Sequence, residues 1–204
     1  MMFEDLTLFI KTKFENDTTG HDFNHVLRVI KNAQIINEQE QQDPQEVYLC
    51  ALLHDVYDEK FFDGDIQQDF NHLVNKFSLD INVDKMLHDL KNIGFKGGFE
   101  QPTLSRVGLI VQDADRLDAM GAIGIARTFA YGGHKGHVLY DPLLEYTPLE
   151  KKSDYRQMRP TLFHFYDKLL KLKDLMVTPK AQEIAEQRHQ FMIDFLKQFY
   201  EDIS

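Results

Sequence analysis

Residues 43–55, DPQEVYLCALLHD, decide the fold class of this chain. Asp43 is a good N-cap, the proline after it suits the first helical position, and Glu46 stands at the third, where it completes a capping box. Residues 47–53 are apolar on nearly every side of a helix, which is typical of a helix buried in a core. The stretch therefore predicts a buried helix whose end carries two polar residues, His54 and Asp55.

Helical periodicity continues on both sides of this stretch, and no Val/Ile alternation typical of strands is present. Besides the helix that begins after Asp43, we expect helices at about residues 6–14, 22–38, 65–77, 83–93, 103–120, 123–130, 161–173 and 179–200. Short connections imply that neighbouring helices pack against each other. The predicted fold class is all-α, a compact bundle of roughly eight or more helices.

Length and composition narrow the function classes. The chain has 204 residues, 43% of them hydrophobic, which favours one domain over residues 1–204. We expect a motif-bearing core at about 20–130, with the C-terminal helices of 160–200 packed on it. A single cysteine excludes a disulfide framework and a Cys-based zinc site. No apolar run reaches the length of a membrane span and no secretory signal is present, so we expect a cytoplasmic protein.

The charge balance guides the search for a site. The formal net charge is −10, whereas binding to a nucleic acid polymer usually needs a basic face. An acidic chain that binds a phosphorylated small molecule needs a metal ion or a few local cations. Whether the chain is a monomer or a homodimer is left open by the helical pattern.

The first polar feature is the run His21-Asp22-x-x-His25-x-x-Arg28. On a helix, His21, His25 and Arg28 fall on one face, each a turn from the next. Two imidazoles and a guanidinium on one face could bind a metal and a phosphate together. The competing explanation is a solvated helix edge.

The second feature follows the buried helix. Residues 54–60 contain five polar side chains in seven positions. Burying His54 with Asp55 is costly unless they are paired or bind a metal, and acidic residues have the wrong sign for a helix C-terminus. The competing explanation is a solvated tail. Acidic residues at this end conflict with the helix dipole, and that conflict favours a functional role for the segment.

The third feature is the segment 111–118, in which three aspartates flank an apolar helical stripe. Asp118 lies nearest the centre of that stripe, and Asp113 and Asp115 border it on opposite sides. Periodicity therefore does not choose among the three. Together the features offer imidazole and carboxylate ligands from three helices, a set that suits manganese, iron, cobalt, nickel or magnesium better than structural zinc.

The ordered set of His25, His54-Asp55 and Asp115 resembles the signature of the HD-domain metal-dependent phosphohydrolases. Longer segments, 21–29, 53–61 and 112–124, resemble the YpgQ/YedJ-type subgroup of that family. The resemblance implies a single all-helical HD domain that holds one divalent metal ion through His25, His54, Asp55 and Asp115. The Ala-Asp-Arg-Leu context is what favours Asp115 over its neighbours.

The resemblance also implies an activity and roles for other residues. The subgroup is associated with nucleotides, including release of pyrophosphate from nucleoside or deoxynucleoside triphosphates. Asp58 and Glu59 match acidic residues near the attacking water. Tyr57 replaces a small residue of the subgroup, and we expect it to narrow the pocket. The cations that we expect to neutralise a polyphosphate are His21, Arg28, Lys60, Lys96 and Arg127.

Other functions stay open at this point. The same metal centre could serve a nucleoside monophosphate phosphatase or a cyclic-nucleotide phosphodiesterase. A nucleotide- or metal-responsive binding module with little turnover is a further alternative, because fold does not dictate activity. A purely structural helical protein would require three polar features to coincide by chance.

Overall fold

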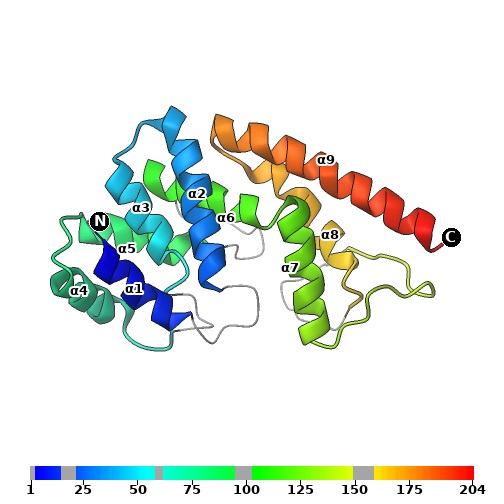
Figure 1. Cartoon of the computed structure of the whole chain (residues 1–204), viewed down its shortest axis with the longest axis horizontal. Helices are drawn as coiled ribbons and strands as arrows, with labels where there is room; N and C mark the ends of the chain where they lie inside the picture. Colours follow the sequence, from blue (N-terminus) through cyan, green and yellow to red (C-terminus); the bar gives the residue numbers. More distant parts are fainter. Residues whose placement is uncertain (1–2, 15–21, 58–61, 95–102, 149–158) are drawn as a thin grey trace. The chain divides into compact units, whose positions relative to one another are not determined.

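The computed structural model describes residues 3–14, 22–57, 62–94, 103–148 and 159–204. Within these ranges it contains nine α-helices and no strand, which confirms the all-α prediction (Figure 1). The helices are α1 (Glu4–Lys13), α2 (Phe23–Glu40), α3 (Pro44–Leu53), α4 (Ile66–Lys76), α5 (Val83–Asn92), α6 (Arg106–Asp118), α7 (Gly121–His134), α8 (Phe163–Asp167) and α9 (Pro179–Asp202). None of these helices is long and apolar enough to cross a membrane.

The chain divides into two compact units, Met1–Asp115 and Arg116–Ser204. The boundary falls inside α6, so this one helix contributes residues to both units. Each unit has a buried apolar core of its own. The expectation of one domain over the whole chain stays a prediction.

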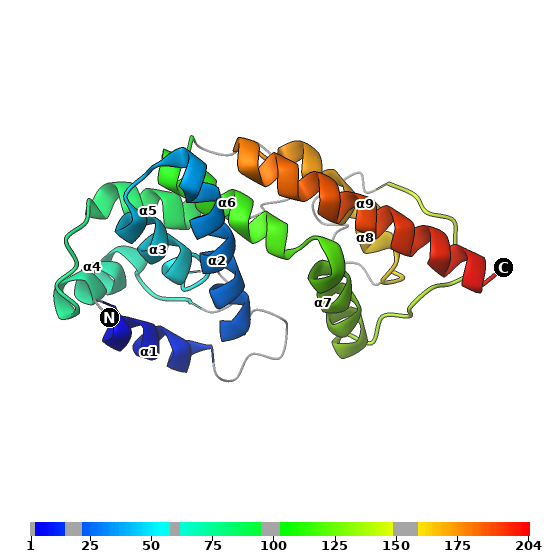
Figure 2. The same cartoon turned by 45° about the horizontal axis from the view of Figure 1, so that its top comes forward.

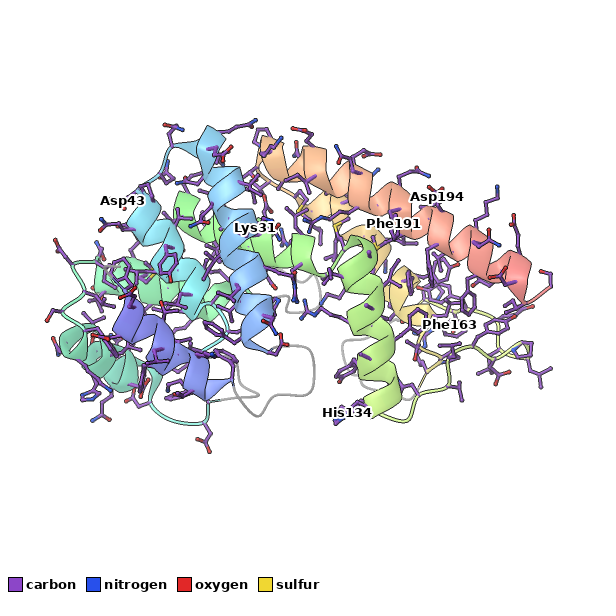
Figure 3. All side chains as sticks on the ribbon, viewed as in Figure 1. Lys31, Asp43, His134, Phe163, Phe191 and Asp194 are labelled. Carbon is purple, nitrogen blue, oxygen red and sulfur yellow. The ribbon has the colours of Figure 1, made fainter. Side chains whose placement is uncertain are left out.

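The first unit is built around α3. Every residue of α3 from Leu49 to Leu53 is buried, as the apolar run predicts. The helix packs against α2 most extensively and also contacts α1 and α5 (Figures 1 and 2). At the start of α3, visible in Figure 3, the Asp43 carboxylate accepts hydrogen bonds from the backbone N–H groups of Gln45 and Glu46. The Asp43 cap fixes where α3 begins, and the buried residues 49–53 place its end inside the core of the unit.

Other helix starts in this unit also have side-chain caps. Asp22, Asp65 and Asn82 cap α2, α4 and α5, each by accepting a backbone N–H. Ser105 does the same for α6, because its hydroxyl oxygen accepts the N–H of Gly108 at 3.2 Å. The helix therefore begins at Arg106, three residues later than the sequence pattern predicts.

The second unit differs most from expectation in its helix boundaries. The helix α7 continues to His134 instead of ending near 130, and Gly132 lies in its last turn. A Cβ at this glycine would stand 2.2 Å from the hydroxyl oxygen of Thr161, so close packing explains the residue. The single helix expected at 161–173 is instead interrupted at Lys168 (φ −137°, ψ −59°) and continues as two short 3₁₀ helices, Leu169–Lys171 and Lys173–Leu175.

An aromatic cluster forms the core of the second unit. The ring of Phe165 stacks on that of Phe195 with centroids 5.8 Å apart, and Phe129 lies 6.0 Å from both. These residues come from α7, α8 and α9, so the cluster joins the three helices of this unit. Phe165 is fully buried at the centre of these contacts.

Candidate metal centre

His25 is placed by the start of α2. The Asp22 carboxylate that caps this helix accepts the backbone N–H of His25 at 3.0 Å. The His25 side chain is fully buried, on the face of α2 that also buries Val26 and Val29. A fully buried imidazole needs polar partners, and these come from the end of α3 and from α6.

His54 caps the C-terminal end of α3, where its ring is oriented by a backbone carbonyl. The ring atom Nδ1 lies 2.8 Å from the carbonyl oxygen of Ala51. Because a carbonyl oxygen only accepts, Nδ1 carries the proton, and in the neutral ring Nε2 keeps its lone pair. This Nε2 lies 3.2 Å from the Nε2 of His25. The two imidazoles therefore point their outer nitrogens at the same place.

Two carboxylates complete the cluster. The Oδ2 atom of Asp55 lies 3.3 Å from His25 Nε2 and 3.4 Å from His54 Nε2. The Oδ1 atom of Asp115, on α6, lies 3.5 Å from His25 Nε2. The side chains of Asp55 and Asp115 are 14% and 28% exposed, whereas the imidazoles are 1% or less. The carboxylates thus form the solvent-facing side of the cluster.

The electrostatics of the cluster favour positive charge. Burial by itself would lower the pKa of His54, but the charge and hydrogen bond of Asp55, together with the charge of Asp115 and the Ala51 carbonyl, outweigh it and raise the pKa to about 9. A position at which carboxylates stabilise an imidazolium also stabilises a metal cation, which would replace the proton.

The donor set fits a divalent metal ion. Single ligand atoms of His25, His54 and Asp115 all lie within 4.8 Å of one another. Neighbouring ligands held at about 2.1 Å from one ion are themselves about 3.0–3.4 Å apart. The contacts of 3.2–3.5 Å among the imidazole and carboxylate atoms match that spacing. Mixed nitrogen and oxygen donors belong to the chemistry of divalent transition metals and magnesium.

The structure also separates the three aspartates of α6. Asp115 joins the imidazoles, whereas the carboxylate of Asp118 accepts a hydrogen bond from Arg127 Nη1 at 2.7 Å within the second unit. Asp113 is fully buried and is not part of the metal-ligating group found among the described residues. Tertiary structure thus makes the choice that periodicity left open.

The residues expected to bind substrate are only partly described. Arg28 is half-buried on α2, one turn beyond His25. Arg127 lies on α7, where it pairs with Asp118. The remaining predicted residues lie outside the described part of the chain: His21, Asp58, Glu59, Lys60 and Lys96.

Two buried amides that sequence analysis missed hold α6 in place. Asn32 lies two turns beyond His25 on α2, and its Nδ2 donates to the carbonyl oxygen of Ala114 at 3.2 Å. Gln112 donates to the carbonyl oxygen of Ile93 at 3.1 Å. Each bond fixes α6 close to Asp115. The signal available in the sequence was a polar residue inside an apolar stripe, as at Asn32.

Comparison with known proteins agrees with this geometry. The HD domain family matches residues 22–120. The YpgQ protein of Bacillus subtilis is 38% identical over 205 residues, which cover 98% of this chain and 93% of that protein.

Solved structures resemble the whole chain. The structure of Bacillus subtilis YpgQ in complex with ADP has a TM-score of 0.75 at 36% identity, covering 99% of this chain and 97% of that one. An HD-superfamily hydrolase from Bacillus thuringiensis has a TM-score of 0.76 at 40% identity, with coverages of 98% and 95%. A Lactobacillus plantarum protein has a TM-score of 0.84 at 32% identity, with coverages of 98% and 96%. The chain therefore belongs to the HD-domain family of HD-superfamily hydrolases, as a close homologue of YpgQ.

Proposed function

We propose that this protein is a metal-dependent phosphohydrolase that acts on nucleotides and releases pyrophosphate from ribo- or deoxyribonucleoside triphosphates. The observation that carries the proposal is the cluster of two imidazoles and two carboxylates in the first unit, in which His25 Nε2 lies 3.2–3.5 Å from the other three groups. The complex of its homologue YpgQ with ADP supports a nucleotide as the substrate class. The choice of pyrophosphate as product rests on the resemblance of the sequence motifs.

In this proposal His25, His54, Asp55 and Asp115 hold one divalent ion, which is manganese, iron, cobalt, nickel or magnesium. Such an ion, when bound, polarises a phosphoryl oxygen and lowers the pKa of a coordinated water. The bond from His54 Nδ1 to the Ala51 carbonyl fixes the ring and its tautomer, as partners of metal-bound histidines commonly do. The partly exposed carboxylates leave the ligand cluster open to solvent on their side.

The other residues bind the substrate and move the proton. Asp58, with Glu59 beside it, orients the attacking water and takes its proton, as a general base does. Arg28, His21, Lys60 and Lys96 bind the phosphates. Local cations are needed because the chain carries a formal net charge of −10, which repels a polyphosphate at long range. Arg28 is the best candidate among them, because it lies on the same helix as the ligand His25 and one turn beyond it.

The test is an analysis of products formed by the manganese-loaded protein. The substrates are nucleoside and deoxynucleoside triphosphates, monophosphates and cyclic nucleotides. We expect pyrophosphate and a nucleoside monophosphate from the triphosphates. The variant His54→Ala should lose this activity, whereas His72→Ala, which removes an exposed histidine of α4, should keep it.

Each of the other possible results would indicate a different function. Free phosphate from monophosphates alone would make the protein a nucleotidase, and opening of cyclic nucleotides would make it a phosphodiesterase. No turnover, together with bound manganese and a nucleotide-dependent rise in melting temperature, would establish a binding module instead. Equal activity in His54→Ala and wild type would place the chemistry outside the cluster.

A further inference from the structure

Tyr57 ends the turn that carries two ligands of the proposed metal centre. The turn begins at His54, and the backbone N–H of Val56 donates to the carbonyl oxygen of Leu53 at 3.0 Å, so the coil of α3 continues into it. Tyr57 lies two residues beyond Asp55 and immediately before Asp58 in the sequence. Whatever holds Tyr57 therefore also restrains the backbone at Asp55.

The side chain of Tyr57 is held by residues of α4 and of the segment that precedes this helix. It is 6% exposed, and its ring meets those of Phe62 and Phe70 edge-on at centroid distances of 5.2 and 6.0 Å. Its hydroxyl donates to Oδ2 of Asp69, in the first turn of α4, at 3.0 Å. The ring fills core space beside these two phenylalanines, and the expectation that Tyr57 narrows a substrate pocket stays a prediction.

The Tyr57 hydroxyl is the donor in this bond, because the carboxylate oxygen of Asp69 only accepts. Packing of an aromatic ring restrains its plane, whereas a hydrogen bond adds a direction. Among the described residues, α4 supplies no ligand to the cluster, so the Tyr57–Asp69 bond is a support and not part of the chemistry.

The restraint acts on Asp55, whose Oδ2 lies 3.3 and 3.4 Å from two imidazole nitrogens although the residue stands past the last turn of α3 and is partly exposed. His54 is also fixed by its bond to the Ala51 carbonyl. We propose that Tyr57 is a positioning residue, whose hydroxyl bond to Asp69 holds the 54–57 turn so that Asp55 faces both His25 and His54. This inference rests on the proposed metal centre.

The experiment measures metal binding, independently of turnover. Manganese affinity is determined by calorimetric titration for wild type, Tyr57→Phe and Asp69→Ala, and the visible spectrum of the cobalt-loaded protein reports ligand geometry. We expect both variants to weaken manganese binding by about tenfold, at the low end of what loss of an outer support costs. The double variant should be no weaker than either single variant, because both remove one bond.

Two controls separate positioning from general destabilisation. Tyr48→Phe removes a comparable hydroxyl bond, 2.8 Å long, between Tyr48 on α3 and Thr7 on α1. Asp69→Asn keeps an oxygen that accepts the Tyr57 hydroxyl and should restore the affinity. Both controls should bind manganese within about twofold of wild type and leave the cobalt spectrum unchanged.

The outcomes distinguish the two proposals. If wild type binds manganese and Tyr57→Phe binds it equally well, the positioning role is overturned while the proposed function stands. An equal loss in Tyr48→Phe would also overturn it, because the effect would then be general. If wild type binds no divalent ion, the metal centre and this inference fail together.

Discussion

Two largely buried histidines, one in each unit, respond to burial in opposite ways. The pKa of His54 in the first unit is raised from 6.5 to about 9, because Asp55 and Asp115 outweigh the cost of burial. The pKa of His164 in the second unit is lowered to about 3, by burial and then by Lys168. Burial alone expels charge from an imidazole, so the rise at His54 measures how strongly its carboxylate neighbours stabilise positive charge. That distinguishes a cation site from an ordinary core histidine.

The same contrast appears between two aspartates one turn apart on α6. The charge of the Asp118 carboxylate is balanced within the protein, because it pairs with the guanidinium of Arg127, whose charge is permanent. Arg188 also lies near Asp118, whose charge partly offsets the lowering of the Arg188 pKa by burial. Asp115 instead faces an imidazole that carries no permanent charge. One carboxylate is neutralised by the fold, and the other is available to an exchangeable cation.

The largest expected effect comes from breaking the cation site at Asp115. Asp115→Asn removes one negative charge and one strong donor, so manganese affinity should fall by at least about 100-fold, more than loss of an outer support costs. Calorimetric titration measures this. The melting temperature of the metal-free protein should change little, because the Asp115 side chain is 28% exposed. Unchanged manganese affinity would remove Asp115 from the ligand set.

Asp118→Asn should produce the converse result. It leaves the partly buried charge of Arg127 without its carboxylate, which should lower the free energy of unfolding by about 1–3 kcal/mol. Urea denaturation of the metal-free protein checks the magnitude. Manganese affinity should stay within a few-fold of wild type. A loss as large as that of Asp115→Asn would make Asp118 a ligand and erase the contrast.

The smallest effect is the pH dependence contributed by His164. Its folded pKa of about 3 lies below the ordinary 6.5, so in acid the unfolded chain binds a proton that the folded chain does not. The stabilising contribution is complete above pH 6.5 and is lost as the pH falls toward 3. His164→Gln should remove about 2 kcal/mol of the stability that wild type loses between pH 7 and pH 5. Parallel stability profiles for the two proteins would show that His164 titrates normally in the fold.

Local sequence signals predicted most of the helices because their causes are local. The caps at Asp22, Asp43 and Asp65 accept N–H groups within three residues, so the helix starts after them were readable from sequence. The wrong end of α7 has a distant cause. Gly132 reads as a helix breaker until Thr161 is seen packed against it.

The candidate site likewise has features that could be predicted from the sequence and features that could not. The residue types were readable, because imidazoles and carboxylates at helix ends conflict with burial and with the helix dipole. Periodicity did not give their grouping, since it left Asp113, Asp115 and Asp118 open, and only the family resemblance favoured Asp115. The supports at Asn32 and Tyr57 also escaped notice, because an amide or a hydroxyl has no meaning until its partner is known.

The sequence by itself determined the all-α class, the buried α3 helix and the polar residues at its end, because capping and hydrophobic periodicity act within a few residues. Only the tertiary structure decided that Asp115 joins His25 while Asp118 pairs with Arg127. That decision depends on the rotation of α6 about its axis, which is set by packing and by bonds such as Asn32 to Ala114 between residues far apart in sequence.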